Sequence, residues 1–161
     1  MFFLYQILIL ILLILSPIII SFRILKKKED AKRFKEKFCI PSKKRVAGNL
    51  IWFHGSSVGE LLSVIPLINQ LEKNKHINQI LITSSTLSSA EIFKNYKFKK
   101  VVHQFFPIDF FLYSYKFLNY WRPTITIFIE SEVWPSIFRA LNTKKIPLLL
   151  PRSIHIVFLK S

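Results

Sequence analysis

The sequence has 161 residues, a formal net charge of +15 and a hydrophobic content of 51%. This length allows one domain of ordinary size and excludes two sizeable cores. The single cysteine, Cys39, excludes a disulfide framework, and four histidines without ligand-like spacing give no indication of a metal site.

The first predicted element is an apolar helix over residues 1–22. No charged side chain occurs from Phe2 to Phe22, and a run of about 20 apolar residues matches the hydrocarbon thickness of a bilayer. A cleaved signal peptide would have a basic start and a small-residue cleavage site, whereas here the lysines follow the apolar run. We therefore predict a retained membrane anchor, with Arg23 and Lys26 to Lys28 holding the rest of the chain on the cytoplasmic side. Pro17 leaves open a helix embedded obliquely on one side of the membrane.

A basic juxtamembrane segment follows at residues 23–45. It carries eleven lysine or arginine residues against three acidic ones, which is +8 of the chain's +15. A basic cluster beside a membrane helix is attracted to anionic lipid. Nucleic acid is the alternative partner for such charge, but no recognition motif accompanies the segment. We expect anionic membrane lipids as partners and no nucleic acid.

Residues 46–150 alternate apolar runs with amphipathic ones. Apolar strands separated by helices indicate an α/β domain with a doubly wound parallel sheet. In the helix over 59–73, the inward side chains are predicted to be Leu62, Ile65, Leu67 and Ile68, and Asp109 is a candidate N-cap for the helix that starts there. The predicted strands are 49–53, 77–85, 99–107, 122–130 and 146–150, and the predicted helices are 59–73, 87–96, 109–121 and 134–145.

Three polar stretches follow predicted strands, where open α/β sheets bind ligands. They are "HGSSVGE" (54–60), "TSSTLSSAE" (83–91) and "ESEVWP" (130–135). None is a phosphate loop, because the three glycines at positions 48, 55 and 59 form neither G-x-G-x-x-G nor a Walker A sequence.

Each polar residue in these stretches also has a purely structural interpretation. Glu60 in a first helical turn meets the helix macrodipole favourably without any catalytic role. Ser56 and Ser57 are common N-cap residues, and we expect His54 to donate to a backbone carbonyl. Glu130 and Glu132 are harder to explain structurally, because a carboxylate at the end of an apolar strand is costly to bury without hydrogen-bond donors.

The same stretches match the pattern of one known family. "WFHGSSVGE" is similar to its H-x-x-S-V-G-E signature, and "RPTITIFIESEVWP" to a strand that ends E-T-E-L-W-P. "LITSSTLSSAE" and "HQFFPID" are similar to its T-T-T-x-T-x-x-x-x-E and H-x-Y-x-P-x-D stretches. From the anchor to about Pro147, the chain resembles the N-terminal half of the bacterial 3-deoxy-D-manno-octulosonic acid (Kdo) transferases of lipopolysaccharide synthesis, which are glycosyltransferases with two Rossmann domains (GT-B).

The resemblance implies a fold and a reaction. Residues 46–150 would be a Rossmann-like acceptor domain, one lobe of a GT-B enzyme at the inner membrane. The enzyme would transfer Kdo from CMP-Kdo to the lipid A precursor with inversion, without a cofactor or divalent metal. Glu60, which matches the last residue of S-V-G-E, is implied as the general base. The implied substrate-binding residues are Ser56, Ser57, Gly59, Glu130 and Glu132.

After residue 150 the sequence departs from the family. Relatives continue with an N-A-R-x-S stretch and a second, donor domain, whereas residues 151–161 keep at most Arg152 and Ser153 of that stretch and turn apolar. We expect a truncated acceptor half that is inactive on its own, or one completed by a separately encoded C-terminal domain. The alternative function is a non-catalytic, membrane-anchored module that binds lipid or scaffolds other proteins. Both signatures favour the transferase, since scaffolding requires neither.

Overall fold

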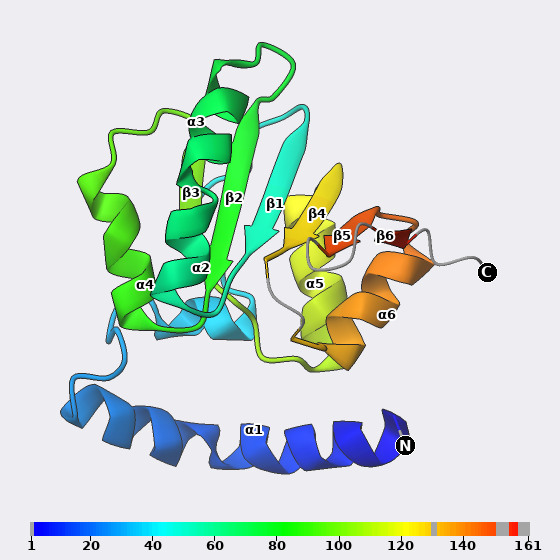
Figure 1. Ribbon diagram of the computed structural model, residues 1–161. Coiled ribbons are helices and arrows are strands. Elements are labelled where there is room, and N and C mark those ends of the chain that lie inside the picture. The colour runs from blue at the N-terminus through cyan, green and yellow to red at the C-terminus, as the bar shows by residue number, and fades with distance from the viewer. Residues whose placement is uncertain (1, 130–131, 151–154, 158–161) are drawn as a thin grey trace.

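The computed structural model describes residues 2–129, 132–150 and 155–157. Glu130, Arg152 and Ser153, which the sequence singled out, lie outside these described residues. Within them, a long N-terminal helix precedes a layered domain of strands and helices (Figure 1). The prediction of an α/β domain behind an apolar helix is confirmed.

A six-stranded sheet forms the centre of the domain, in the order β3-β2-β1-β4-β5-β6. The first five strands in the chain are parallel, as predicted. The sixth was not predicted, and it pairs antiparallel with β5. The strands are β1 (Leu50–His54), β2 (Gln79–Ser84), β3 (Val101–Phe105), β4 (Ile125–Phe128), β5 (Leu148–Leu150) and β6 (His155–Val157).

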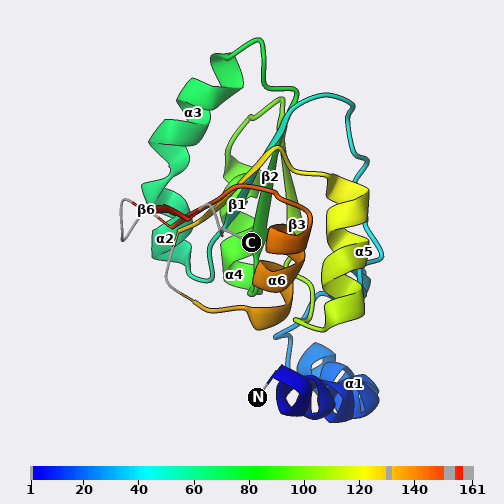
Figure 2. The same cartoon turned by 90° about the vertical axis from the view of Figure 1, so that its right-hand side faces the viewer.

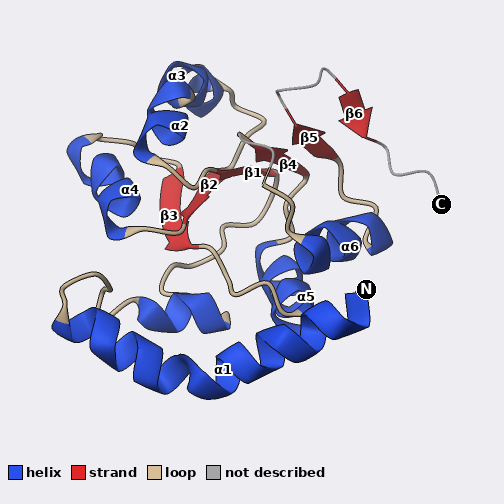
Figure 3. Cartoon of the chain, turned by 60° about the horizontal axis from the view of Figure 1, so that its bottom comes forward, coloured by secondary structure: helices blue, strands red, loops and turns tan. Residues whose placement is uncertain are grey.

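Helices cover both faces of this sheet, because each parallel crossover requires a connection over a face. Helices are visible on either side of the sheet (Figure 3), and the two buried clusters show which helix packs on which face. β2 pairs with β1 on one side and β3 on the other, and helices cover both of its faces. All six of its residues are therefore buried. The first face carries α2 (Val58–Ser63), α3 (Ile65–Lys73) and α4 (Leu87–Ile92), and the second carries α5 (Phe111–Trp121) and α6 (Pro135–Thr143).

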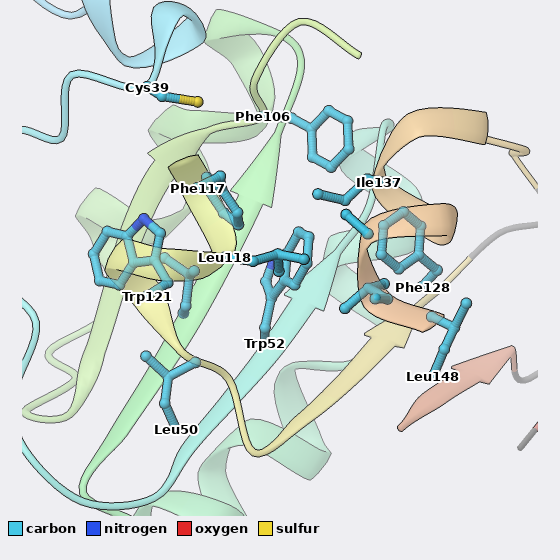
Figure 4. Packing of buried hydrophobic residues seen from close by; sticks show 13 residues of the cluster. Cys39, Leu50, Trp52, Phe106, Phe117, Leu118, Trp121, Phe128, Ile137 and Leu148 are labelled. Carbon is cyan, nitrogen blue, oxygen red and sulfur yellow. The ribbon is translucent and has the colours of Figure 1, made fainter. Parts of the chain in front are cut away.

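Aromatic side chains fill the space between the sheet and α5 and α6 (Figure 4). The ring centroid of Trp52 lies 4.8 Å from that of Phe117 and 5.4 Å from that of Phe128. Trp52 Nε1 donates to Thr83 Oγ1 at 2.9 Å, which satisfies the one polar atom of the indole. This packing fixes β1 two residues before its carboxyl end.

The helix predicted over residues 59–73 is instead two helices that meet at Val64. Pro66 explains the break, because it has no N–H to donate to the carbonyl of Leu62 and its ring crowds that carbonyl. The inward stripe is Leu61, Ile65 and Ile68, with helical spacing i, i+4 and i+7. The predicted inward positions Leu62 and Leu67 were wrong, since their side chains are 44% and 41% exposed.

The basic segment is partly folded onto the domain, which the sequence did not predict. It contains a short 3₁₀ helix, η1 (Phe34–Phe38). The carboxylate of Glu36 is buried there and accepts from Arg33 Nε at 2.8 Å and from the backbone N–H of Phe105 in β3 at 2.7 Å. Arg23, Arg33 and Lys37 thus form ion pairs inside the protein. Only part of the segment's positive charge is free to interact with lipid.

The N-terminal helix α1 (Phe2–Leu25) is long and apolar enough to cross a membrane, by length and composition. It runs across the domain on the side to which the arrowhead of β2 points, and a view turned by 90° shows the same arrangement (Figures 1 and 2). The carboxyl edge of the sheet consequently faces α1.

Candidate active site

The loops that follow β1, β2 and β4 meet at the carboxyl edge of the sheet. His54, the last residue of β1, pairs in register with Thr83 of β2 and Phe128 of β4. β1 is also the strand at which the order reverses, with β2 on one side and β4 on the other. Open α/β sheets bind ligands outside the strand ends at such a point. The structure thus brings the described parts of the three polar stretches to one place.

Glu60 lies in the first turn of α2, and backbone N–H groups hold its carboxylate. Its Oε2 accepts from Ser56 N at 2.8 Å, and its Oε1 accepts from Ser57 N at 3.0 Å. In return, Ser57 Oγ accepts from Glu60 N at 3.3 Å, which completes a capping box. A carboxylate has about four acceptor positions, so Glu60 retains acceptor capacity for a further donor.

Ser56 connects the loop after β1 to the loop after β4 and to the start of α4. Its Oγ donates to Glu132 Oε2, and its carbonyl oxygen accepts from Ser89 Oγ, in the first turn of α4, at 3.4 Å. Glu60 and Glu132 are therefore linked through one serine, by its backbone and by its hydroxyl. Glu132 is exposed, so solvent as well as Ser56 compensates its charge.

The glycines of the loop differ in what surrounds them. A Cβ at Gly59 would meet nothing within 4 Å, so Gly59 borders open space. The sequence analysis implied that Gly59 belongs to the substrate-binding residues. A Cβ at Gly55 would lie 2.9 Å from Leu61 Cδ2 and 3.0 Å from Ile129 Cδ1. At Gly55, which the sequence did not single out, a larger residue would force the buried Leu61 side chain and the Ile129 side chain to shift.

His54 is 2% exposed and lies within the aromatic cluster. Its ring centroid is 4.0 Å from that of Phe106 and 4.7 Å from that of Phe128. Its Nδ1 lies 3.0 Å from Thr83 Oγ1, where we had expected a backbone carbonyl as the partner. Burial lowers the pKa of His54 to about 3, because desolvation disfavours the charged imidazole. The residue is therefore a neutral packing element behind the loop.

Asp109 was predicted to cap α5, and that prediction was wrong. The N-cap of α5 is Phe110, without a side-chain hydrogen bond. The Asp109 carboxylate instead accepts from Ser136 N at 3.0 Å and from Ile137 N at 2.9 Å, and so caps α6. Trp134 stands at the N-cap position of α6, and its side chain has no hydrogen-bond acceptor. In the sequence, this was the signal that another residue must cap α6.

Comparison with known proteins places most of the chain in one family. Residues 32–152 match the family model described as 3-Deoxy-D-manno-octulosonic-acid transferase (kdotransferase). The match begins inside the basic segment and covers every candidate site residue.

Individual relatives agree with that match. A probable mitochondrial 3-deoxy-D-manno-octulosonic acid transferase of Arabidopsis thaliana is 40% identical over 83% of this chain and 30% of its own length. The 3-deoxy-D-manno-octulosonic acid transferase of Rickettsia bellii is 41% identical over 82% of this chain and 32% of its own, and that of Rickettsia typhi is 33% identical over 85% and 39%. The chain thus spans about a third of the length of these curated relatives.

Proposed function

The chain belongs to the 3-deoxy-D-manno-octulosonic acid transferase family, and we propose that it forms the acceptor lobe of an enzyme that transfers Kdo from CMP-Kdo to the lipid A precursor. In this proposal residues 46–150 are one Rossmann-like lobe of a GT-B glycosyltransferase, and the CMP-Kdo site lies on a second lobe outside these 161 residues. The strand order with its reversal at β1 supports the proposal.

One observation carries the assignment of the site. Ser56 bridges Glu60 and Glu132 at the carboxyl edge of the sheet, and these two carboxylates come from the two stretches that resemble the family's signatures. A sugar hydroxyl is a weak nucleophile that needs a positioned base, which typically contributes about 10²–10⁴-fold. The capping box holds the Glu60 carboxylate in place before an acceptor arrives.

The proposed reaction is a single displacement. The acceptor hydroxyl oxygen attacks the anomeric carbon of Kdo as the bond from that carbon to the CMP phosphate breaks, and CMP leaves with the bonding electrons. Glu60 takes the hydroxyl proton, and the attack inverts the anomeric centre. Ser56, Ser57 and Glu132, together with Gly59 and Glu130, would orient the acceptor. No step needs a cofactor or a divalent metal.

The basic segment and α1 would bring the site to its lipid substrate. The lipid A precursor is anionic and membrane-bound, and a juxtamembrane basic cluster attracts anionic lipid by about 1 kcal/mol per residue near the surface. We place the lobe on the cytoplasmic side of the inner membrane, because lysines follow the apolar helix.

The test combines the chain with the donor half of the Rickettsia bellii relative. We expect no Kdo transfer by the 161-residue chain alone and measurable transfer by the pair. In the pair, Glu60→Gln should lower the transfer rate roughly 10²-fold or more without loss of acceptor binding.

The matched control is Glu72→Gln. Glu72, in the last turn of α3, also accepts from two backbone N–H groups, those of Lys99 and Lys100 at 2.6 and 2.8 Å. These two residues precede β3, so the contact lies at the amino end of that strand, away from the carboxyl edge. Near-normal transfer by Glu60→Gln would refute Glu60 as the base. Transfer by the chain alone would refute the two-lobe proposal, and lipid binding without transfer in any pairing would favour the scaffolding alternative.

A further inference from the structure

The N-terminal end of α1 contacts the domain directly, and its C-terminal end is held to the basic segment, which itself packs on β3. At the N-terminal end, Tyr5 OH donates to Asp109 Oδ2 at 2.8 Å, and Gln6 Nε2 donates to Ser136 Oγ at 2.8 Å. The amide of Gln6 also accepts from Phe111 N at 3.0 Å. Figure 3 shows this end of α1 beside the first turns of α5 and α6.

At the C-terminal end, two ion pairs that share Glu29 hold the chain as it leaves the helix. Glu29 is 6% exposed, and its Oε2 lies 3.1 Å from Arg23 Nε and 2.7 Å from Lys37 Nζ. Arg23 and Lys37 are therefore held together at Glu29, beside η1.

The contacts of Tyr5 and Gln6 are incompatible with a helix that crosses the bilayer. Tyr5 and Leu25 are separated by about 30 Å along a helix that rises 1.5 Å per residue, which equals the thickness of the hydrocarbon core, about 30 Å. If α1 spanned, Tyr5 would lie on the far side of the membrane from Asp109. The hydrogen bonds of Tyr5 and Gln6 can form only when α1 stays on the side of the domain.

The other faces of α1 are apolar and uncovered. Phe3, Ile14, Ile18 and Leu25 are each more than 70% exposed, a state that is unfavourable in water along so long a helix. Water is therefore not the expected surrounding of these faces.

Cations flank the apolar surface at both ends. Arg139 lies over the ring of Phe2, with 4.8 Å from guanidinium carbon to ring centroid, and Lys26 Nζ lies 4.3 Å from the centroid of Phe22. Each end also has an open groove, of about 510 Å³ at Arg139 and about 480 Å³ at Lys26. Apolar surface bordered by cations is complementary to acyl chains below a layer of lipid phosphates.

We propose that α1 lies in the plane of an anionic lipid surface, with its outer faces among the acyl chains, its N-terminal end hydrogen-bonded to the domain and its C-terminal end held through the basic segment. The proposal rests on membrane anchoring and does not require the transferase activity. It places the carboxyl edge of the sheet against the lipid headgroups, because that edge faces α1 (Figure 1).

The same contacts connect membrane binding to the site. Asp109 accepts from Tyr5 and also caps α6, and α6 begins directly after the loop that carries Glu132. Asp109 thus joins α1 to the first turn of α6, next to the loop that carries Glu132.

The first test is a cross-link in vesicles of phosphatidylethanolamine and phosphatidylglycerol. In a Cys39→Ala background, the pair Gln6→Cys and Phe111→Cys should be joined within one chain by a short bismaleimide, because Phe111 is exposed and its N–H contacts Gln6. The control pair, Ser21→Cys with Phe111→Cys, should give severalfold less product, because residue 21 lies about 22 Å along the helix from residue 6. Cross-linking in detergent that is lost in vesicles would overturn the proposal, and so would products joined only between two chains.

A second test measures the depth of α1 in the membrane and does not depend on cross-linking α1 to the domain. Spin labels at Leu4→Cys, Ile14→Cys and Leu25→Cys, all exposed positions, should report the same shallow depth by collision with oxygen and with a water-soluble nickel complex. A spanning helix would place the label at residue 14 deepest and the other two at opposite surfaces, which would overturn the proposal. Neither test measures sugar transfer, so a failure here would leave the function proposed above untouched.

Discussion

Glu60 has two tasks in the proposed enzyme, since the carboxylate that would take a proton also closes the capping box of α2. Sequence reasoning identified both tasks and treated them as alternatives. They are compatible, because the backbone N–H groups of Ser56 and Ser57 occupy only part of the acceptor capacity of the carboxylate. A structural role at one residue is therefore no argument against a chemical one.

Two buried histidines make stability depend on pH. Burial lowers the pKa of His54 and of His103 to about 3, and Arg33 adds to the effect at His103. The unfolded chain takes up these protons near pH 6.5 and the folded chain does not. Stability is thus highest above pH 6.5, and below it falls by about 1.4 kcal/mol per pH unit for each histidine.

Urea titrations between pH 7.5 and 5 measure this dependence. Removing one of the two groups by His54→Phe should roughly halve the slope of unfolding free energy against pH, whatever the change in absolute stability. His76→Gln, at an exposed position, should leave the slope unchanged. A slope equal to that of the unsubstituted chain in the His54 variant would contradict the assignment.

Asp109 is expected to matter more for stability than its position in a loop suggests. Asp109→Asn places an amide N–H₂ against the N–H of Ser136 or Ile137 and leaves a buried donor unsatisfied, at a cost of about 1–3 kcal/mol. Asp30→Asn is the control, since Asp30 Oδ1 accepts from Lys32 N and Arg33 N in a less buried place. Equal losses in the two variants would show that the Asp109 contacts contribute nothing beyond an ordinary turn.

At the scale of elements, we expect alanine substitutions at two glycines, one in the polar loop and one in the helix after it, to change stability in opposite directions. Gly59→Ala adds a methyl group in open space inside α2 and should stabilise the fold by about 0.5–1 kcal/mol through helix propensity. Gly55→Ala places a methyl group against Leu61 and Ile129 and should destabilise it by about 1–3 kcal/mol. Thermal unfolding of both variants checks the signs, and two changes of the same sign would contradict the packing described here.

The sequence predicted the elements that local patterns determine. Five parallel strands and the position of the polar stretches follow from apolar runs and from the rule that ligand loops follow strands. The break at Val64 was readable in principle from Pro66, but periodicity alone suggested one continuous helix. The cap that Asp109 gives to α6 and the pairing of Glu36 with β3 join residues 27 and 69 positions apart, and no local pattern encodes such contacts.

At the scale of the whole molecule, α1 should dominate membrane association over the basic segment. Its exposed apolar surface is insensitive to salt, whereas exposed charges are screened within about 10 Å at 0.1 M salt. The chain should stay with membranes in high salt and leave them in detergent. A variant lacking residues 2–22 should bind anionic vesicles weakly and be released by salt. Sedimentation measures both, and salt release of the full chain would show that charge alone holds it.

The contacts of α1 also fix an order of events during synthesis. Tyr5 is separated from Asp109 by 104 residues, and Gln6 from Ser136 by 130. At about 5–20 residues per second, the apolar helix leaves the ribosome several seconds before its partners exist. Lipid is available throughout that interval. If α1 binds lipid as proposed, the helix would meet the bilayer first, and the domain would complete its folding beside a segment already at the membrane surface.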